Sequence, residues 1–135
     1  LYRVGGTKAI AGMRKYVFVD GSMADNIRPA LYGSNYEAAL ANRALEPATE
    51  TVSIAGRCCE SGDMLVWETK LPAAAPDDLL VVGRTGAYTY SMASNYNRLP
   101  RPAVVLITSS KAELIVRGES WTDLTRFDLI PEHLR

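Results

Sequence analysis

The chain has 135 residues, 47% of them hydrophobic and 22% charged, which suits one globular domain with a hydrophobic core. Lys and Arg together number 15, as do Asp and Glu, so no basic surplus favours binding to nucleic acid or to an anionic membrane. The apolar runs reach about five residues, far short of the roughly 20 that a membrane-spanning helix needs, so neither a membrane span nor a secretory leader is expected.

Short runs rich in β-branched and aromatic residues recur along the chain, each bounded by turn-forming residues. The chain begins at Leu1 inside such a pattern and without a methionine, so we expect a domain excised from a longer protein. The other predicted strands are 16–19, 51–54, 64–70, 79–82, 103–107 and 113–117, the last two forming a hairpin. This spacing predicts a mainly β fold, a small barrel or sandwich with one or two short helices.

Helix signals in the first half of the chain are few. Pro29 favours a helical turn because proline is well tolerated at the first helical position, while Arg28 before it is expected to be extended. Residues 36–45 are rich in alanine and are helical by propensity.

A second helix signal lies near the C-terminus. Ser120 and Asp123 have the spacing of a capping box, in which each side chain accepts a backbone N–H of the other residue. Leu124 and Phe127 would then share one helical face, and Pro131 would keep the helix short.

The only two cysteines, Cys58 and Cys59, are adjacent. Neighbouring cysteines seldom bond to each other because the ring would be strained, and zinc sites need spaced ligands. We therefore expect two free thiols in a reducing compartment, which indicates a cytoplasmic protein. Cys58 is interpreted as a small buried hydrophobic residue, whereas Cys59 could act as an acid or nucleophile if its environment tunes it.

Four more side chains lie in polar, glycine-containing segments between the predicted strands. The guanidinium of Arg28 could clamp a carboxylate with two parallel hydrogen bonds, and Tyr32 would share its face in a helical turn. Glu60 could bind an ammonium group, and Tyr88 could donate to a phosphate.

Each of these residues also has a purely structural interpretation. An arginine near a turn more often forms a surface ion pair, and Glu60 and Asp63 could simply cap a turn. Tyr88, Tyr90 and Tyr96 could form one face of a half-buried strand. Taken singly, the structural interpretation is favoured for each residue, and only their combination favours a site.

The combination lies in residues 20–33 (DGSMADNIRPALYG), 59–63 (CESGD), 86–97 (GAYTYSMASNYN) and 101–103 (RPA). In order and spacing it resembles the C-terminal domain of the diaminopimelate decarboxylases, which are fold-type III decarboxylases dependent on pyridoxal 5′-phosphate. The resemblance covers nearly the whole chain.

The resemblance implies a two-domain enzyme that converts meso-2,6-diaminopimelate to L-lysine and CO2, the last step of lysine biosynthesis. Residues 1–135 would form the β-domain, and the α/β barrel that binds the cofactor would be absent from this chain. The enzyme would be a homodimer with its active sites at the subunit interface.

The resemblance also implies roles for five residues. Arg28 and Tyr32 would bind the distal end of the substrate, Glu60 its distal amino group, and Tyr88 both cofactor and substrate. Cys59 would donate a proton across the dimer interface. The α-carbon left electron-rich by decarboxylation needs a positioned acid, and an ordinary thiol, with a pKa of about 8.5, is largely protonated at neutral pH. A carboxylate such as Glu60 favours that protonated form.

Two positions depart from local expectation. Ser22 stands where the family commonly has glycine, which affects only the turn geometry. Residues 36–45 are extended in the family, and we expect extended chain here because packing overrides propensity.

The chain alone is expected to be inactive, because no lysine in it has the sequence context of the cofactor-binding lysine. Two alternatives remain open. One is a stand-alone β-domain without catalytic activity, and the other is a decarboxylase for a different diamino acid. Arg28 argues against the latter, because a substrate without a distal carboxylate would leave its guanidinium unpaired.

Overall fold

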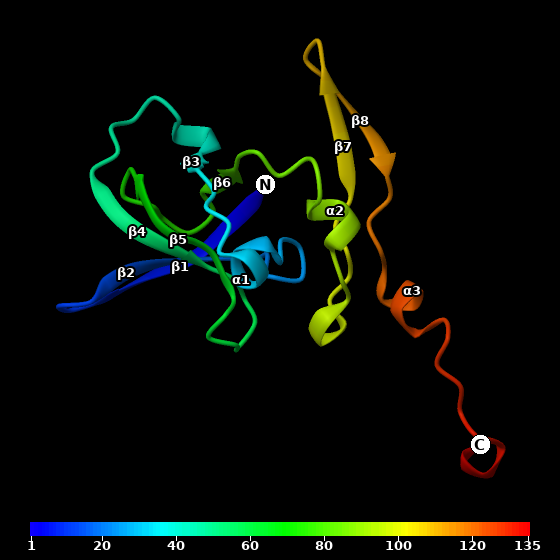
Figure 1. Cartoon of the computed structure of the whole chain (residues 1–135). Coiled ribbons are helices and arrows are strands. Elements are labelled where there is room, and N and C mark those ends of the chain that lie inside the picture. The colour runs from blue at the N-terminus through cyan, green and yellow to red at the C-terminus, as the bar shows by residue number, and fades with distance from the viewer. The chain divides into compact units, whose positions relative to one another are not determined.

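The structure is a computed structural model that describes all residues, 1–135. The chain forms two compact units, Leu1–Ala93 and Ser94–Arg135, and each is described by itself (Figure 1). None of its helices is both long and apolar enough to cross a membrane.

The first unit is built on a strongly curved sheet of six strands (Figure 1). Its strands are β1 (Tyr2–Ile10), β2 (Arg14–Val19), β3 (Ala38–Leu40), β4 (Glu50–Ala55), β5 (Met64–Leu71) and β6 (Leu79–Val82), in the spatial order β3-β6-β1-β2-β4-β5. Only β2 and β4 pair in parallel; the other neighbours are antiparallel. The end strands β3 and β5 contact each other, so the sheet is a nearly closed barrel, as predicted.

Hydrophobic side chains that alternate with exposed ones along the strands fill the interior of this barrel. On β2, Val17 and Val19 are buried while Phe18 between them is exposed, as the two-residue period of a strand requires. The largest fully buried core residues are Leu40, Ile54, Leu65, Leu71 and Leu80. All the buried hydrophobic residues lie in the first unit.

The long connection from β2 to β4 carries the short helix α1 (Arg28–Tyr32), β3 and a 3₁₀ turn, η1 (Ala41–Arg43). The helical turn expected around Pro29 is confirmed, but the expectation that Arg28 is extended is wrong, because Arg28 is the first helical residue. Proline is tolerated here because the amides of a first helical turn have no intrahelical partner. Gly33 ends the helix in the left-handed region, with φ 61°.

Residues 36–45 do not form an α-helix. Ala38–Leu40 is extended and pairs with β6, as the family resemblance predicts, and helical propensity is expressed only in η1. A strand position beside β6 has overridden the preference of alanine.

The second unit contains the predicted hairpin, formed by β7 (Val104–Thr108) and β8 (Lys111–Val116) in antiparallel register. Ser109 and Ser110 have φ values of 47° and 64°, the positive values that a tight two-residue hairpin turn needs. The unit also contains 3₁₀ turns η2 (Tyr96–Arg98) and η3 (Glu132–Leu134) and the helix α3 (Trp121–Thr125).

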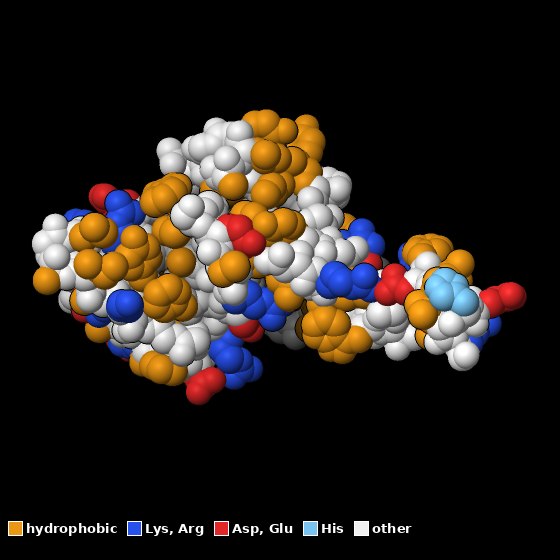
Figure 2. Space-filling view, turned by 90° about the horizontal axis from the view of Figure 1, so that it is seen from below, with side chains coloured by type: hydrophobic (Ala, Val, Ile, Leu, Met, Phe, Trp, Pro, Cys, Tyr) orange, Lys and Arg blue, Asp and Glu red, His pale blue; other side chains and the backbone are white.

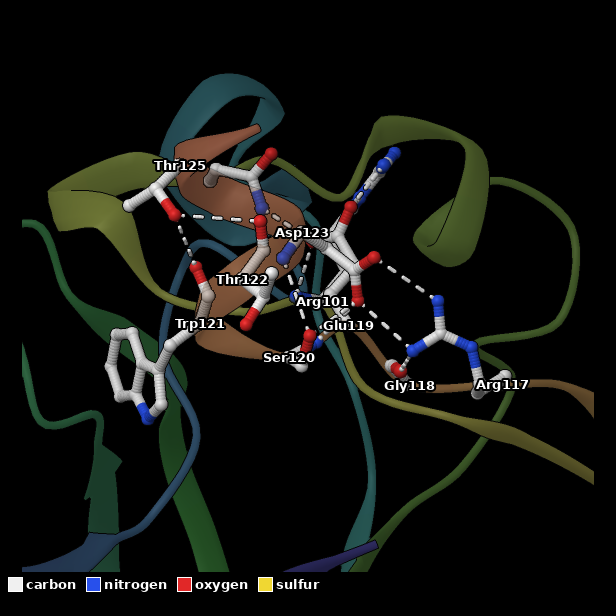
Figure 3. A network of polar contacts seen from close by, with 10 residues as sticks. Arg101, Arg117, Gly118, Glu119, Ser120, Trp121, Thr122, Asp123 and Thr125 are labelled. Atoms are coloured by element: carbon white, nitrogen blue, oxygen red, sulfur yellow. Dashed lines mark hydrogen bonds and ion pairs between the residues drawn. The ribbon is translucent and has the colours of Figure 1, made fainter. Parts of the chain in front are cut away.

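The capping box at the start of α3 is confirmed (Figure 3). The hydroxyl of Ser120 accepts the Asp123 N–H at 3.2 Å, and the Asp123 carboxylate accepts the Ser120 N–H at 2.7 Å. The helix ends at Thr125, so the prediction that Leu124 and Phe127 share a helical face is wrong.

Candidate functional site

The segment that leads into α1 is a closed turn. Ser22 is fully buried, and its hydroxyl accepts the Ala24 N–H at 3.0 Å while its carbonyl accepts the Asp25 N–H at 2.9 Å. The Asp25 carboxylate accepts the Ser22 N–H in return, at 2.9 Å. The side chain and backbone of Ser22 therefore both take part in closing this turn.

The chain packs closely around this turn. A Cβ on Gly21 would lie 2.0 Å from the Tyr2 ring, so only glycine leaves room for that aromatic side chain. Burial, together with nearby carboxylates led by Asp25, raises the pKa of Tyr2 far above its usual value. Burial also raises the pKa of Asp25. These groups are part of the packing that holds the start of α1 in place.

Arg28 lies between two phenol rings. Its guanidinium carbon is 5.2 Å from the centre of the Tyr32 ring and 5.1 Å from that of Tyr88. Cation–π contacts of this kind orient an arginine while its N–H groups stay available. Both tyrosines are more than half exposed, so the cluster can be reached by a ligand.

The Arg28 cluster borders an open hollow of about 450 Å³, which we name the arginine hollow. Its lining includes Arg28, Ser34, Asn35, Tyr36, Arg84 and Tyr88. Two of these lining residues are cations. Arg84 forms an ion pair with the exposed Glu37 at 3.1 Å, whereas the contacts described for Arg28 are with aromatic rings. This chemistry suits a carboxylate or phosphate oxygen.

Tyr88 reaches the arginine hollow from the connection after β6. It immediately precedes α2 (Thr89–Met92), and its carbonyl accepts the Met92 N–H at 2.9 Å. The alternative that Tyr88, Tyr90 and Tyr96 line one face of a strand is therefore wrong, because this part of the chain is helical and turn-like.

Cys59 and Glu60 lie on the turn between β4 and β5. Cys59 is exposed and Cys58 is half-buried, so Cys58 is less buried than expected, and neither cysteine forms a disulfide, as predicted. The Cys59 Sγ lies 4.0 Å from Glu60 Oε1, a long contact even for a sulfur donor.

This turn borders a second hollow of about 440 Å³, which we name the thiol hollow. Its lining includes Tyr16, Phe18, Cys59, Glu60, Met64 and Trp67. Three of these lining residues are aromatic, and the guanidinium carbon of Arg14 lies 5.4 Å from the centre of the Trp67 ring. The cysteine expected to donate a proton is therefore open to the outside and is not enclosed by hydrocarbon.

The structure thus sorts the five predicted site residues into two groups. Arg28, Tyr32 and Tyr88 lie together, and Cys59 and Glu60 lie together. No residue lines both hollows. No group of three or more His, Cys, Asp or Glu side chains could hold a metal ion.

Sequence reasoning missed part of the role of Asp63, which it interpreted only as an acid that caps its own turn. Asp63 is 2% exposed, and its two carboxylate oxygens accept the N–H groups of Cys58 and of Met23. The bond to Cys58 could be expected from the short spacing. The bond to Met23 spans 40 residues and has no local signal.

Comparisons with known proteins identify the family and the fold of this chain. Residues 1–86 match the family described as "Pyridoxal-dependent decarboxylase, C-terminal sheet domain". The chain belongs to this family. It is 58% identical to diaminopimelate decarboxylase of Bacillus subtilis over 129 residues, which is 96% of this chain and 29% of that protein.

Solved structures give the same result. The chain superimposes on diaminopimelate decarboxylase of M. jannaschii with a TM-score of 0.88 at 34% identity, covering 99% of this chain and 30% of that one. For the enzyme of Helicobacter pylori the TM-score is 0.83 at 29% identity, covering 94% of this chain and 30% of that one. The chain thus spans less than a third of the length of these relatives, and the predicted fold class and family resemblance are confirmed.

The family name implies pyridoxal phosphate, and the residues described fit contact with that group. The guanidinium of Arg28 and the phenol of Tyr88 can donate to phosphate or carboxylate oxygens. No lysine lines either hollow, so these residues do not fit covalent attachment of the cofactor.

Proposed function

We propose that this chain is the C-terminal β-domain of a diaminopimelate decarboxylase, which converts meso-2,6-diaminopimelate to L-lysine and CO2. The observation that carries the proposal is the 58% identity with the Bacillus subtilis enzyme over 96% of the chain. The remaining part of such an enzyme, an α/β barrel, would bind the cofactor.

Arg28 recognises the distal carboxylate of the substrate in this proposal. Its guanidinium stands between Tyr32 and Tyr88, which orient it and add phenol donors beside it. A decarboxylase for a diamino acid without that carboxylate would leave this cation unpaired, so diaminopimelate is favoured. The Helicobacter pylori structure was solved as a complex with L-lysine, the product expected here.

Cys59 supplies the proton that replaces the lost carboxylate. Pyridoxal 5′-phosphate, when bound, provides the electron sink that makes loss of CO2 possible. The exposed thiol of Cys59 can then deliver its proton to the α-carbon as a positioned acid. Glu60, beside it, binds the distal ammonium group of the substrate.

The two groups of residues serve two different active sites of a homodimer. Arg28 and Cys59 border separate hollows, so a single substrate in either hollow would meet only one of the two groups. In a two-fold dimer each subunit can give its Arg28 group to one site and its Cys59 group to the other. Each complete site then contains residues from both subunits.

Subunit mixing tests this proposal in the full-length protein that contains this chain. Arg28→Ala and Cys59→Ala variants should each lose decarboxylation of diaminopimelate to lysine. Random reassociation makes half of the dimers mixed, and each mixed dimer has one intact site, so roughly a quarter of wild-type activity should return.

The controls are each variant mixed with itself, which should show no recovery. Activity that stays at the level of the separate variants would show that one subunit supplies both groups to a site. A wild-type protein without activity on diaminopimelate would overturn the proposed substrate itself.

A further inference from the structure

Asp63 joins two segments that are far apart in the sequence. Its Oδ1 accepts the Met23 N–H at 2.6 Å, and its Oδ2 accepts the Cys58 N–H at 2.7 Å. The side chain is almost fully buried, so neither bond competes freely with water. Bonds from backbone N–H groups to a carboxylate are the strong, charge-assisted kind.

Each bond reaches one of the two residue groups described above. Cys58 directly precedes the proposed proton donor Cys59. Met23 lies in the turn that leads to α1, where Arg28 begins the helix. A backbone bond from the Arg57 N–H to the Gly21 carbonyl, at 3.0 Å, joins the same two segments a second time.

The space around the carboxylate is closed. A Cβ on Gly56 would come within 2.3 Å of Asp63 Oδ2, and the Gly56 N–H donates to the Asp63 carbonyl at 2.8 Å. A side chain that only capped its own turn would need none of the contacts to the other segment. The bond to Met23 is therefore the observation that a local role leaves unexplained.

We propose that Asp63 is a positioning residue that holds the Cys59 turn and the Arg28 segment in register with a single carboxylate. This inference rests on the proposed function, because it assigns both segments to catalysis. In the homodimer it has a further consequence: the donor of one active site and the substrate clamp of the other are fixed to the same side chain.

Asp63→Asn in the full-length protein is the test, because asparagine keeps the volume but can accept only one of the two N–H groups well. Its NH2 group would face the other backbone donor. The variant is compared in a Cys58→Ala background, which keeps the backbone N–H and leaves Cys59 as the one thiol of the turn.

Two readouts are measured. The first is the pH profile of alkylation of Cys59 by iodoacetamide, located by mass spectrometry, which does not depend on activity. The second is the division of the kinetic effect between kcat and KM for diaminopimelate. We expect a changed alkylation profile, and a loss in kcat/KM of roughly 10- to 100-fold in which kcat falls and KM rises, because donor and clamp both move.

Leu80→Val is the matched control, because Leu80 is fully buried on β6 and pairs with other strands. It should lower the melting temperature and leave both readouts unchanged. If Asp63→Asn does not fold, Asp63→Ser, which keeps one acceptor, carries the same comparison.

An Asp63 variant with the alkylation profile and kinetic constants of its background would overturn the inference. So would equal changes in the Leu80→Val control, since these would reduce Asp63 to a stability role. Failure of the proposed function can be told apart from failure of this inference. In the first case the parent protein lacks activity on diaminopimelate, while the comparison of Cys59 alkylation still shows whether Asp63 positions the turn.

Discussion

Gly56 shows how a single residue sets the position of the Asp63 carboxylate. Gly56→Ala would place a methyl group 2.3 Å from Asp63 Oδ2, so the carboxylate or the turn has to move. We expect a loss of roughly 1–3 kcal/mol in stability, as for other overpacked sites. Thermal melting of the full-length protein measures it.

Gly62→Ala, in the same turn, is the matched control. Its Cβ would meet nothing within 4 Å, and Gly62 does not have a positive φ. Alanine there should be neutral, or stabilising by about 0.4–1 kcal/mol through the unfolded chain. Equal melting temperatures for the two variants would mean that the Asp63 carboxylate is free to shift.

The residues of the candidate site were visible in the sequence, and their grouping was visible only in part. Arg28 and Tyr32 were predicted to share a face, whereas the contact of Tyr88 with Arg28 was not predicted. That Cys59 borders a different hollow depends on where two connections fold, which local spacing does not determine. The catalytic and binding roles of all five residues stay predictions until they are measured.

Among the elements, the segments joined by Glu119 form the clearest polar network of the second unit (Figure 3). Its carboxylate accepts the Arg101 N–H at 2.9 Å, the Arg101 guanidinium, and the Asn95 amide at 2.6 Å. The bonds from Arg101, followed by that from Asn95, lower the pKa of Glu119 from its ordinary value of 4.5 to about 2.

A depressed pKa makes this network sensitive to acid. The contribution of the network to stability is complete above pH 4.5 and is lost as the pH falls towards about 2. Protonation of Glu119 over that range removes the negative charge that its hydrogen-bond donors face. We expect the protection factor of the Arg101 amide hydrogen, which corrects its exchange rate for the intrinsic pH dependence of amide exchange, to fall over that range.

In the Glu119→Gln variant, the Arg101 amide hydrogen should already be poorly protected at neutral pH, and its protection should lose most of its dependence on acid. Glu132→Gln, at an exposed glutamate of η3, is the control and should behave like the wild type. An Arg101 amide that stays equally protected at acid pH in the wild type would contradict the prediction.

Sequence patterns identified some elements better than others, for physical reasons. The hairpin of β7 and β8 consists of two apolar runs around a short polar turn, and the cap of α3 is a local side-chain exchange. The strand-like pattern at the start of the chain is confirmed as β1, but its end was not predicted, because the strand alternates irregularly and contains two adjacent glycines. α1 was located, but Arg28 was placed outside it, because the restriction on the residue before proline is a bias and not an exclusion.

At the scale of the molecule, hydrophobic burial is uneven. No residue of the second unit is buried, and Trp121, Phe127, Leu129 and Ile107 are each at least 60% exposed. Hydrophobic side chains are spread widely over the surface seen in Figure 2. A two-stranded hairpin is marginal alone in water, and exposed apolar surface of this extent favours association.

The isolated chain should therefore self-associate. It should also be inactive, because no lysine in it has the sequence context of the cofactor-binding lysine. Light scattering should give a mass that rises with protein concentration, and the purified chain should show neither cofactor absorbance nor lysine production from diaminopimelate. A constant monomer mass would contradict the first expectation, and measurable lysine production the second. Supplying the rest of the enzyme by co-expression is the positive control.

The parallel pairing of β2 and β4 has a consequence for how this fold can diversify. Two strands that point the same way cannot be joined by a tight hairpin, so the chain must make a long excursion between residues 19 and 50. Arg28 and Tyr32 lie in that connection and are not part of the sheet. If Arg28 and Tyr32 bind the substrate as proposed, substitutions in this connection should change ligand preference while the pairing of the strands stays as it is.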